Sequence, residues 1–251
     1  MLTQERHTLI LEKLEKYSVV YVNDLVKVLK TSESTIRRDL NQLDKLGLLK
    51  KVHGGATSLN NSFVNTKDFE FEIRQGLNRD EKIRIAKYAA SLIKPDDFIY
   101  LDSGTTTELI IDFVECKDVT FVTNGIGHAK KLVKKNFTTY ILGGELKLKT
   151  EAIVGIEAIN SLKKYNFTKG FFGTNGIDIN RGYTTPDLRE GMVKEEALKR
   201  SKVSYILGDI SKFNEISLIT FGKIGQSKII TTKTLEYSNY KKVTEILEVD
   251  N

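Results

Sequence analysis

The chain has 251 residues, of which 40% are hydrophobic, and a formal net charge of +6. This length suits a small domain plus a larger one, and the composition excludes an intrinsically disordered chain. The single cysteine, Cys116, excludes an internal disulfide and suits a reducing compartment. Charges interrupt the N-terminal stretch, and no apolar run approaches the ~20 residues that would span a bilayer. We therefore expect a soluble, cytoplasmic protein without membrane attachment.

Positive charge is concentrated near the N-terminus. Residues 1–55 hold ten basic and seven acidic residues, so half of the positive excess lies in about a fifth of the chain. A basic segment is compatible with nucleic-acid binding, although a modest excess also suits an ordinary solvated surface.

Two short helices are predicted in this segment. Leu9, Ile10 and Leu14 are spaced for one face of a helix over residues 4–16. After the extended stretch VVYV, the sequence NDLVKVLK predicts a second helix with Asn23 as its N-cap.

A third helix is predicted between Ser32, a suitable N-cap, and Gly47, a suitable residue after the C-terminus. Its residues divide into an apolar stripe and an opposite polar stripe. These are Ile36, Leu40 and Leu43 on the apolar side, and Ser34, Arg37, Arg38 and Asn41 on the polar side. The following LLKKVHGGA predicts a short extended pair with a glycine tip.

Three helices and an extended pair predict a winged helix-turn-helix. Arginine side chains on the third helix can address guanine edges or phosphates, and small hydroxyl residues allow close approach to the major groove. A solvated charged helix face is the alternative for an isolated Arg-Arg pair. The three-helix spacing, the small residues before the pair and the basic LKK after it together favour DNA binding.

The N-terminal motifs resemble those of DeoR-type bacterial transcriptional repressors. Arg6, Ile10 and Leu14, then SESTIRRDL at 32–40, are similar to the signature of that family, and LKKVHGGA at 49–56 is similar to its wing. The resemblance implies DNA contacts by Ser32, Ser34, Thr35, Arg37 and Arg38, with Lys50, Lys51 and His53 on the wing. Asp39 is expected to orient its neighbours, since phosphates would repel its carboxylate.

A small, polar stretch without periodicity follows and predicts a linker. A helix then begins at NRDEKIRIAKYAASLI, with Asn78 and Glu81 at capping-box spacing. We expect a DNA-binding domain over 1–57, a linker over 58–77 and an effector-binding and oligomerisation domain over 78–251.

Apolar runs that end in small polar loops recur through the larger domain: FIYL-DSGTTT, VTFV-TNGIG, TYIL-GGEL, KGFF-GTNGID and VSYIL-GDISKF. Strands that alternate with helices predict an α/β fold with a mostly parallel sheet. Because the carboxyl ends of parallel strands share one edge, these loops are expected to face a common ligand crevice.

DSGTTT, residues 102–107, precedes a predicted helix, ELIIDFV. A helix start after Ser-Gly can present free N–H groups to an anion. Alternatively, Asp102 or Ser103 caps the helix and no ligand is involved. Lys194 and Lys212 favour a phosphate site, because both can bring a positive charge to the same edge.

Competing motifs are weak. GIGHAK at 125–130 approaches the dinucleotide fingerprint, but Lys130 stands in place of the third glycine. Walker and G-x-S-x-G motifs are missing from the sequence. The three histidines and one cysteine lack metal-ligand spacing. No cofactor and no metal are therefore expected.

The larger domain is similar to the effector-sensing half of the same family, whose fold resembles ribose-5-phosphate isomerase. The matching stretches are IYLDSGTTT, FVTNG, LGGE, GTNGID, TTPDLREGMVKEEA and GDISKF. The resemblance implies a phosphate cradle of Ser103, Gly104, Thr105, Thr106, Thr107 and Lys212. It implies sugar contacts or site closure by Asn124, Asp178, Asp187, Glu190 and Lys194, and the same motifs add Asp102 and Gly143 to the effector set.

The isomerases use acidic groups in an Asp-Gly-Ala-Asp loop, whereas this chain has Asn175 at the first position and Asp178 at the last. Asparagine cannot act as a general base, which argues against catalysis, although Glu190 could still serve as one. An isomerase with an appended DNA-binding domain and an architectural DNA-binding protein remain the alternatives.

The resemblance favours a non-enzymatic repressor of a sugar-utilisation operon, linked to phosphotransferase uptake. The expected partners are double-stranded operator DNA, a phosphorylated sugar such as fructose 1-phosphate or tagatose 6-phosphate, and further copies of the chain in a dimer or tetramer.

Overall fold

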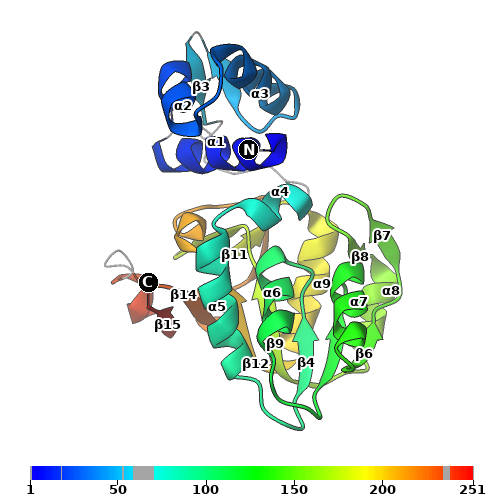
Figure 1. Ribbon diagram of the computed structural model, residues 1–251. Helices are drawn as coiled ribbons and strands as arrows, with labels where there is room; N and C mark the ends of the chain where they lie inside the picture. Colours follow the sequence, from blue (N-terminus) through cyan, green and yellow to red (C-terminus); the bar gives the residue numbers. More distant parts are fainter. Residues whose placement is uncertain (1, 18, 53, 59–70, 234–237, 251) are drawn as a thin grey trace. The chain divides into compact units, whose positions relative to one another are not determined.

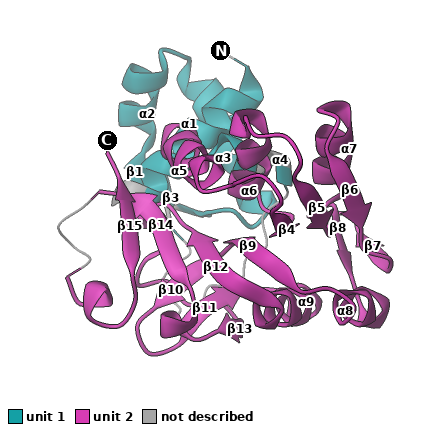
Figure 2. Ribbon diagram, turned by 90° about the horizontal axis from the view of Figure 1, so that it is seen from below, with its two compact units in different colours: residues 1–78 teal, residues 79–251 magenta. Residues whose placement is uncertain are grey.

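The computed structural model describes residues 2–17, 19–52, 54–58, 71–233 and 238–250. The chain forms two compact units, residues 1–78 and residues 79–251, coloured separately in Figure 2. Each unit has its own hydrophobic core.

The first unit contains the three predicted helices and a small sheet. The helices are α1 (Thr3–Tyr17), α2 (Val22–Leu29) and α3 (Glu33–Lys45). Three short strands, β1 (Val19–Tyr21), β2 (Lys50–Val52) and β3 (Gly55–Thr57), pair antiparallel in the order β1-β3-β2. Apolar residues of all three helices, including Ile10, Leu25 and Leu40, form the core, and the predicted winged helix-turn-helix is confirmed.

Both predicted ends of α3 are confirmed. Ser32 is the N-cap, and its Oγ accepts a hydrogen bond from the Thr35 N–H at 3.2 Å. At the other end Gly47 has φ +66°, and the N–H of Leu48 reaches the carbonyl of Leu43 at 2.8 Å. This left-handed residue and its backward hydrogen bond form a Schellman-type helix end.

The predicted cap of the second helix is wrong. β1 passes into α2 without an intervening loop, so the N-cap is Tyr21, which makes no side-chain cap bond, and Asn23 lies inside the first turn.

A short helix, α4 (Phe71–Gly76), lies in the first unit and falls within the segment expected to be a linker. Gly76 lies close to Thr8 of α1, because a Cβ at this glycine would be 2.7 Å from the Thr8 hydroxyl. The predicted capping box of the next helix, α5 (Arg79–Ser91), is wrong. Asn78 has φ +49°, outside the extended region usual for an N-cap, and Glu81 bonds elsewhere.

The second unit is built on a seven-stranded sheet in the order β15-β14-β12-β9-β4-β5-β6. Every neighbouring pair is parallel, which confirms the predicted α/β class. The strands are β4 (Phe98–Leu101), β5 (Thr120–Thr123), β6 (Thr138–Ile141), β9 (Phe167–Gly173), β12 (Ser201–Leu207), β14 (Lys228–Thr232) and β15 (Ile246–Val249).

Helices cover both faces of this sheet. On one face α5, α6 (Thr105–Phe113) and α7 (Ile126–Lys134) pack on Ile99 and Leu101. On the other face α8 (Ile156–Leu162) and α9 (Leu188–Lys199) pack on Tyr100 and its neighbours. Figure 1 shows α5 and α6 in front of the sheet and α9 behind it. Successive residues of β4 thus point to opposite faces of the sheet and enter different cores, as expected for a strand.

Shorter elements occupy the connections. A hairpin of β7 (Glu145–Lys147) and β8 (Ala152–Val154) follows β6. A second small sheet contains β10 (Gly176–Asp178), β11 (Gly182–Thr185) and β13 (Ile219–Gly222). Single turns form η1 (Ile210–Lys212), η2 (Ile224–Gln226) and η4 (Tyr240–Lys242). Within the described residues, none of the helices has the length and apolarity to cross a membrane.

Candidate functional site

The exposed face of α3 carries the side chains expected to contact DNA. Ile36, Leu40 and Leu43 are fully buried on the opposite side. The exposed residues include Ser34, Arg37 and Arg38, with Ser32 at the cap. The Arg37 guanidinium pairs with the Glu33 carboxylate at 2.6 Å one turn earlier, and both side chains are about half exposed. A basic, hydroxyl-rich surface of this kind suits a major groove.

Asp39 holds α3 on α1. Its side chain is 2% exposed, and its two oxygens accept hydrogen bonds from Arg6 Nε at 2.8 Å and Arg6 Nη2 at 3.0 Å. Hydrogen bonding to Asp39 and the negative charge of that carboxylate raise the pKa of Arg6 above its ordinary value. The pair orients the recognition helix, as the sequence suggests for Asp39, and it assigns Arg6 a structural role that the sequence reading missed.

Hydrogen bonds join β2, the first strand of the wing, to α3. Lys51 Nζ donates to Asn41 Oδ1 at 2.6 Å, and the Lys51 N–H donates to Asp44 Oδ1 at 3.0 Å. Lys50 is exposed. His53, also expected on the wing, lies outside the described residues.

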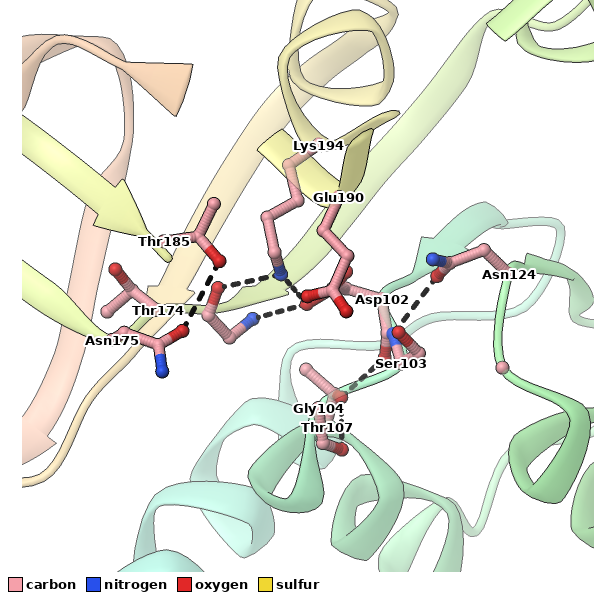
Figure 3. Close-up of polar contacts among 12 residues, drawn as sticks. Asp102, Ser103, Gly104, Thr107, Asn124, Thr174, Asn175, Thr185, Glu190 and Lys194 are labelled. Atoms are coloured by element: carbon pink, nitrogen blue, oxygen red, sulfur yellow. Dashed lines mark hydrogen bonds and ion pairs between the residues drawn. The ribbon is translucent and has the colours of Figure 1, made fainter. Parts of the chain in front are cut away.

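In the second unit, the predicted loop 102–107 follows β4 directly and is buried beneath α9. Asp102 is 1% exposed, and its Oδ2 accepts hydrogen bonds from Lys194 Nζ and, at 3.0 Å, from the Gly173 N–H. Lys194 Nζ also donates to the Gly173 carbonyl at 3.1 Å. Figure 3 shows Lys194 and Glu190 reaching from α9 toward Asp102. The Oδ1 atom of Asp102 is buried and has no hydrogen-bond partner among the described residues.

The start of α6 has no side-chain cap. Gly104 is its N-cap, and the side chains of this loop form no cap bond. The alternative in which Asp102 or Ser103 caps the helix is therefore wrong, because the Asp102 carboxylate turns to Lys194 and Gly173 instead. Thr107 orders the loop, since its hydroxyl lies 2.5 Å from the Asp102 carbonyl and 2.7 Å from that of Gly104.

Two buried polar side chains from neighbouring segments hold the loop in place. Asn124 Oδ1 accepts from the Tyr100 hydroxyl and from the Ser103 N–H, both at 3.1 Å. His128 Nε2 lies 3.0 Å from the Gly104 carbonyl. Burial, the largest cause, lowers the pKa of His128 to about 4. The sequence reading missed His128, because a histidine on a predicted helix gives no sign of its burial.

Lysine side chains approach the same helix start. Lys82 of α5 is 5% exposed, and its Nζ lies 3.4 Å from Thr105 Oγ1. Asp209, at 1% exposure, belongs to the same group. Burial alone would raise the pKa of Asp209, but the charges of Lys212 and Lys82 and bonds from Ser211 lower it below its ordinary value. Lys212 and Lys82 therefore both act on Asp209, and contact of Lys212 with an effector stays a prediction. Lys82 is an addition that the sequence reading missed.

A second ionic cluster joins α9 to the β7–β8 hairpin. Lys147 Nζ lies 3.0 Å from both Asp187 Oδ2 and Glu190 Oε1, and Thr150 Oγ1 lies 2.5 Å from Glu190 Oε1. Asp187 is also the N-cap of α9, because its Oδ1 accepts from the Glu190 N–H at 3.0 Å. Burial would raise the pKa of Asp187, whereas these bonds and Lys147 lower it. Lys147 and Thr150 were not expected from the sequence.

Two family models match the chain. Residues 6–62 match the DeoR-like helix-turn-helix domain, and residues 77–234 match the DeoR C terminal sensor domain. The chain belongs to the DeoR family of transcriptional repressors.

Relatives of this DeoR-family chain align over nearly its full length. "Uncharacterized HTH-type transcriptional regulator FruR" of Bacillus subtilis (strain 168) is 44% identical and covers 98% of each chain. IolR of the same strain is 35% identical, over 92% of this chain and 94% of IolR. The lactose phosphotransferase system repressor of Staphylococcus aureus (strain NCTC 8325 / PS 47) is 34% identical, over 96% of this chain and 95% of the repressor.

Solved structures show more distant likeness. Ribose 5-phosphate isomerase A from Methanocaldococcus jannaschii is 17% identical, with a TM-score of 0.41 over 54% of this chain and 55% of the isomerase. Translation initiation factor eIF-2B from Pyrococcus horikoshii OT3 is 11% identical, with a TM-score of 0.43 over 87% of this chain and 75% of the factor. Scores this low carry no argument about function.

Two residues expected at the effector site of this DeoR-family chain have other surroundings. Asp178 Oδ1 accepts from the N–H groups of Asn180 at 2.9 Å and Arg181 at 2.7 Å, which closes the β10–β11 turn. Gly143 is exposed, and among the described residues an added Cβ there would meet no heavy atom within 4 Å. Their contact with an effector stays a prediction.

Proposed function

We propose that this repressor controls a sugar-utilisation operon and leaves its operator when a phosphorylated sugar binds at the carboxyl end of β4. The observation that carries the proposal is the start of α6, which lacks a side-chain cap and has the buried Lys82 beside Thr105. A helix N-terminus with a neighbouring cation suits a phosphate group. The lactose phosphotransferase system repressor among the relatives supports a sugar as the signal.

The phosphate would lie against the first turn of α6, with Lys82 and Lys212 as cations and the hydroxyls of Ser103, Thr105 and Thr106 as further partners. The sugar would extend toward α9. There the buried Asp102 Oδ1 has no hydrogen-bond partner among the described residues, and a sugar hydroxyl would donate to it. Satisfying a buried carboxylate oxygen is worth more than adding a bond in water, so this atom favours a ligand with hydroxyl groups.

The same contacts argue against catalysis. Glu190 Oε1 accepts from both Lys147 and Thr150, which hold the carboxylate in place as a positioning group. Asn175 Oδ1 accepts from the Thr185 hydroxyl at 3.4 Å, and an amide cannot take up the proton that isomerisation requires. The relatives FruR, IolR and the lactose repressor are transcriptional regulators by name.

On the DNA side, Ser32, Ser34, Thr35, Arg37 and Arg38 would contact the operator, with Lys50, Lys51 and His53 on the wing. One winged module reads few base pairs, so a dimer or tetramer on repeated half-sites is expected. Phosphate contacts by these basic residues would make binding fall steeply with salt.

The test combines two measurements on the full chain. A panel that includes fructose 1-phosphate and tagatose 6-phosphate is screened for a rise in melting temperature, and fluorescence anisotropy follows binding to DNA from upstream of the protein's own gene. We expect one sugar phosphate to raise the melting temperature and weaken DNA binding. Arg38→Ala should lose DNA affinity, by about tenfold, and keep the thermal shift.

Aldose–ketose turnover of the stabilising sugar would contradict the proposal and favour an isomerase. Unchanged DNA binding with every sugar phosphate would favour an architectural protein.

A further inference from the structure

The two units meet in the chain at a short segment that is anchored on both sides. Asn78 is the last residue of the first unit, and its N–H donates to Glu12 Oε1 of α1 at 3.2 Å. Arg79 begins the second unit and α5. Three peptide bonds separate Asn78 from Glu81, a reach of at most about 10 Å. A displacement of the first turn of α5 must therefore pull on a residue that α1 holds.

Glu81 connects the first turn of α5 by hydrogen bonds to the carboxyl end of the sheet. Its Oε2 accepts from the hydroxyl of Thr232, the last residue of β14, at 3.0 Å. The same oxygen lies 3.5 Å from the N–H of Ile210, the first residue of η1. η1 also contains Lys212, one of the two lysines that lower the pKa of Asp209. Glu81 thus links α5 to the segment that carries one of the candidate phosphate ligands.

The next residue along the chain faces the other candidate ligand position. Lys82 follows Glu81 and lies beside Thr105 at the start of α6. One turn of α5 is consequently tied to the α6 start through Lys82 and to the η1 segment through Glu81. An anion between Lys82 and Lys212 would attract both lysines and weaken their electrostatic interaction with Asp209, so the turn and η1 would move together.

We propose that Glu81 is the positioning residue that transmits occupation of the effector site to the DNA-binding unit. The inference rests on the proposed function and specifies its regulation. Glu81 makes the first turn of α5 follow η1, and Arg79 passes the change to Asn78, which α1 holds through Glu12. Allosteric coupling requires that the ligand favour one arrangement of such an element over another. The coupling path is then residues 78–82.

Three substitutions in the full chain separate coupling from binding. Glu81→Gln weakens the acceptor, and Thr232→Val removes the donor of the same hydrogen bond while leaving residue 81 charged. Asp80→Asn is the matched control, because it removes one negative charge from the same helical turn at an exposed position. Two quantities are measured: the dissociation constants of fructose 1-phosphate and tagatose 6-phosphate, and the ratio of operator dissociation constants with and without each of them.

We expect that ratio to fall about tenfold in Glu81→Gln and Thr232→Val, the effect of one hydrogen bond to a charged group. Sugar-phosphate affinity for the DNA-free protein should change by less than about threefold. Asp80→Asn should match the wild type. The double variant should lose no more than the more affected single variant, because both substitutions act on the same Glu81–Thr232 hydrogen bond.

If a sugar phosphate releases Glu81→Gln and Thr232→Val from operator DNA as fully as it releases the wild type, the inference is overturned and the proposed function stays intact. A loss of sugar-phosphate affinity that accounts for the whole effect would also overturn it, since Glu81 would then only shape the site. If neither sugar phosphate binds the wild type or releases it from DNA, the proposed function fails and the coupling fails with it.

Discussion

Two helix starts in this protein have similar sequences but differ in capping and burial. TSEST opens α3 and DSGTTT opens α6, and both combine hydroxyl side chains with an acid. At α3 the exposed Ser32 side chain satisfies the Thr35 N–H. At α6 the N-cap is Gly104, without a side-chain cap, and the three threonines are at most 8% exposed. The exposed helix supplies its own cap, whereas the buried helix has no side-chain cap, so under the proposed function its N–H groups are left for a small ligand.

The charged side chains near the two helix starts also differ in burial. Arg37 on α3 is half exposed and pairs with Glu33. Near α6, Lys82 and Lys194 are each at most 6% exposed, and Lys194 pairs with Asp102, which is 1% exposed. Burial strengthens electrostatic interactions and makes an unpaired charge costly. We therefore expect substitutions at the buried start to have larger effects than those at the exposed one.

The largest effect is expected from the histidine behind the buried start. The pKa of His128 is about 4 in the folded chain, against about 6.5 when exposed. A lowered histidine pKa means that the unfolded chain binds the proton more readily between these values, so stability falls as the pH falls from 6.5 to 4. The loss amounts to about 3 kcal/mol at pH 4. Chemical unfolding of wild type and His128→Gln at pH 7 and pH 4 measures it.

His128→Gln should be less sensitive to acid than the wild type, because glutamine does not titrate and still offers an N–H to the Gly104 carbonyl. Equal losses in both proteins would show that other groups cause the acid sensitivity.

The sequence predicts the elements of both helix starts but not the burial of the charged and polar groups around them. Ser32, Gly47 and the apolar stripe of α3 are local signals, and all are confirmed. Lys82, Lys147 and His128 are missed, because only the packing of distant segments makes these residues partners of the loop or of α9. Asn23 shows a local signal overridden by tertiary structure: β1 continues into α2 and leaves no room for a cap.

Lys82→Met tests whether the buried start holds an anion. The substitution keeps the unbranched side chain and removes the charge beside Thr105. Sugar-phosphate affinity should fall about 100-fold, or about 2.7 kcal/mol, as expected for a charge-assisted bond to phosphate. Lys87→Met is the control, because Lys87 is exposed on the same helix. Calorimetric titration measures both, and equal affinities in the two variants would place the phosphate elsewhere.

Gly104→Ser makes the buried start resemble the exposed one. Gly104 has φ −85° and ψ 156°, which suit a serine cap, and an added Cβ would lie 3.2 Å from Thr107 Oγ1. The new hydroxyl would take an N–H group of α6 and occupy space beside it, so sugar-phosphate affinity should fall about tenfold. Melting of the ligand-free protein should change little. Undiminished affinity in the same titration would show that the α6 N–H groups do not bind the ligand.

The smallest effect is expected at the exposed start. Ser32→Ala removes the oxygen that accepts the Thr35 N–H, which costs about 1 kcal/mol and lowers the melting temperature of the first unit by several degrees. Ser34→Ala, which removes a neighbouring exposed hydroxyl, should melt like the wild type. Ser32→Asp separates the two roles of this residue. Its carboxylate can still accept the N–H, so stability should match the wild type, but it brings a negative charge to the face proposed to bind DNA, so operator affinity should fall. Wild-type stability together with wild-type operator affinity would show that Ser32 caps the helix without approaching DNA.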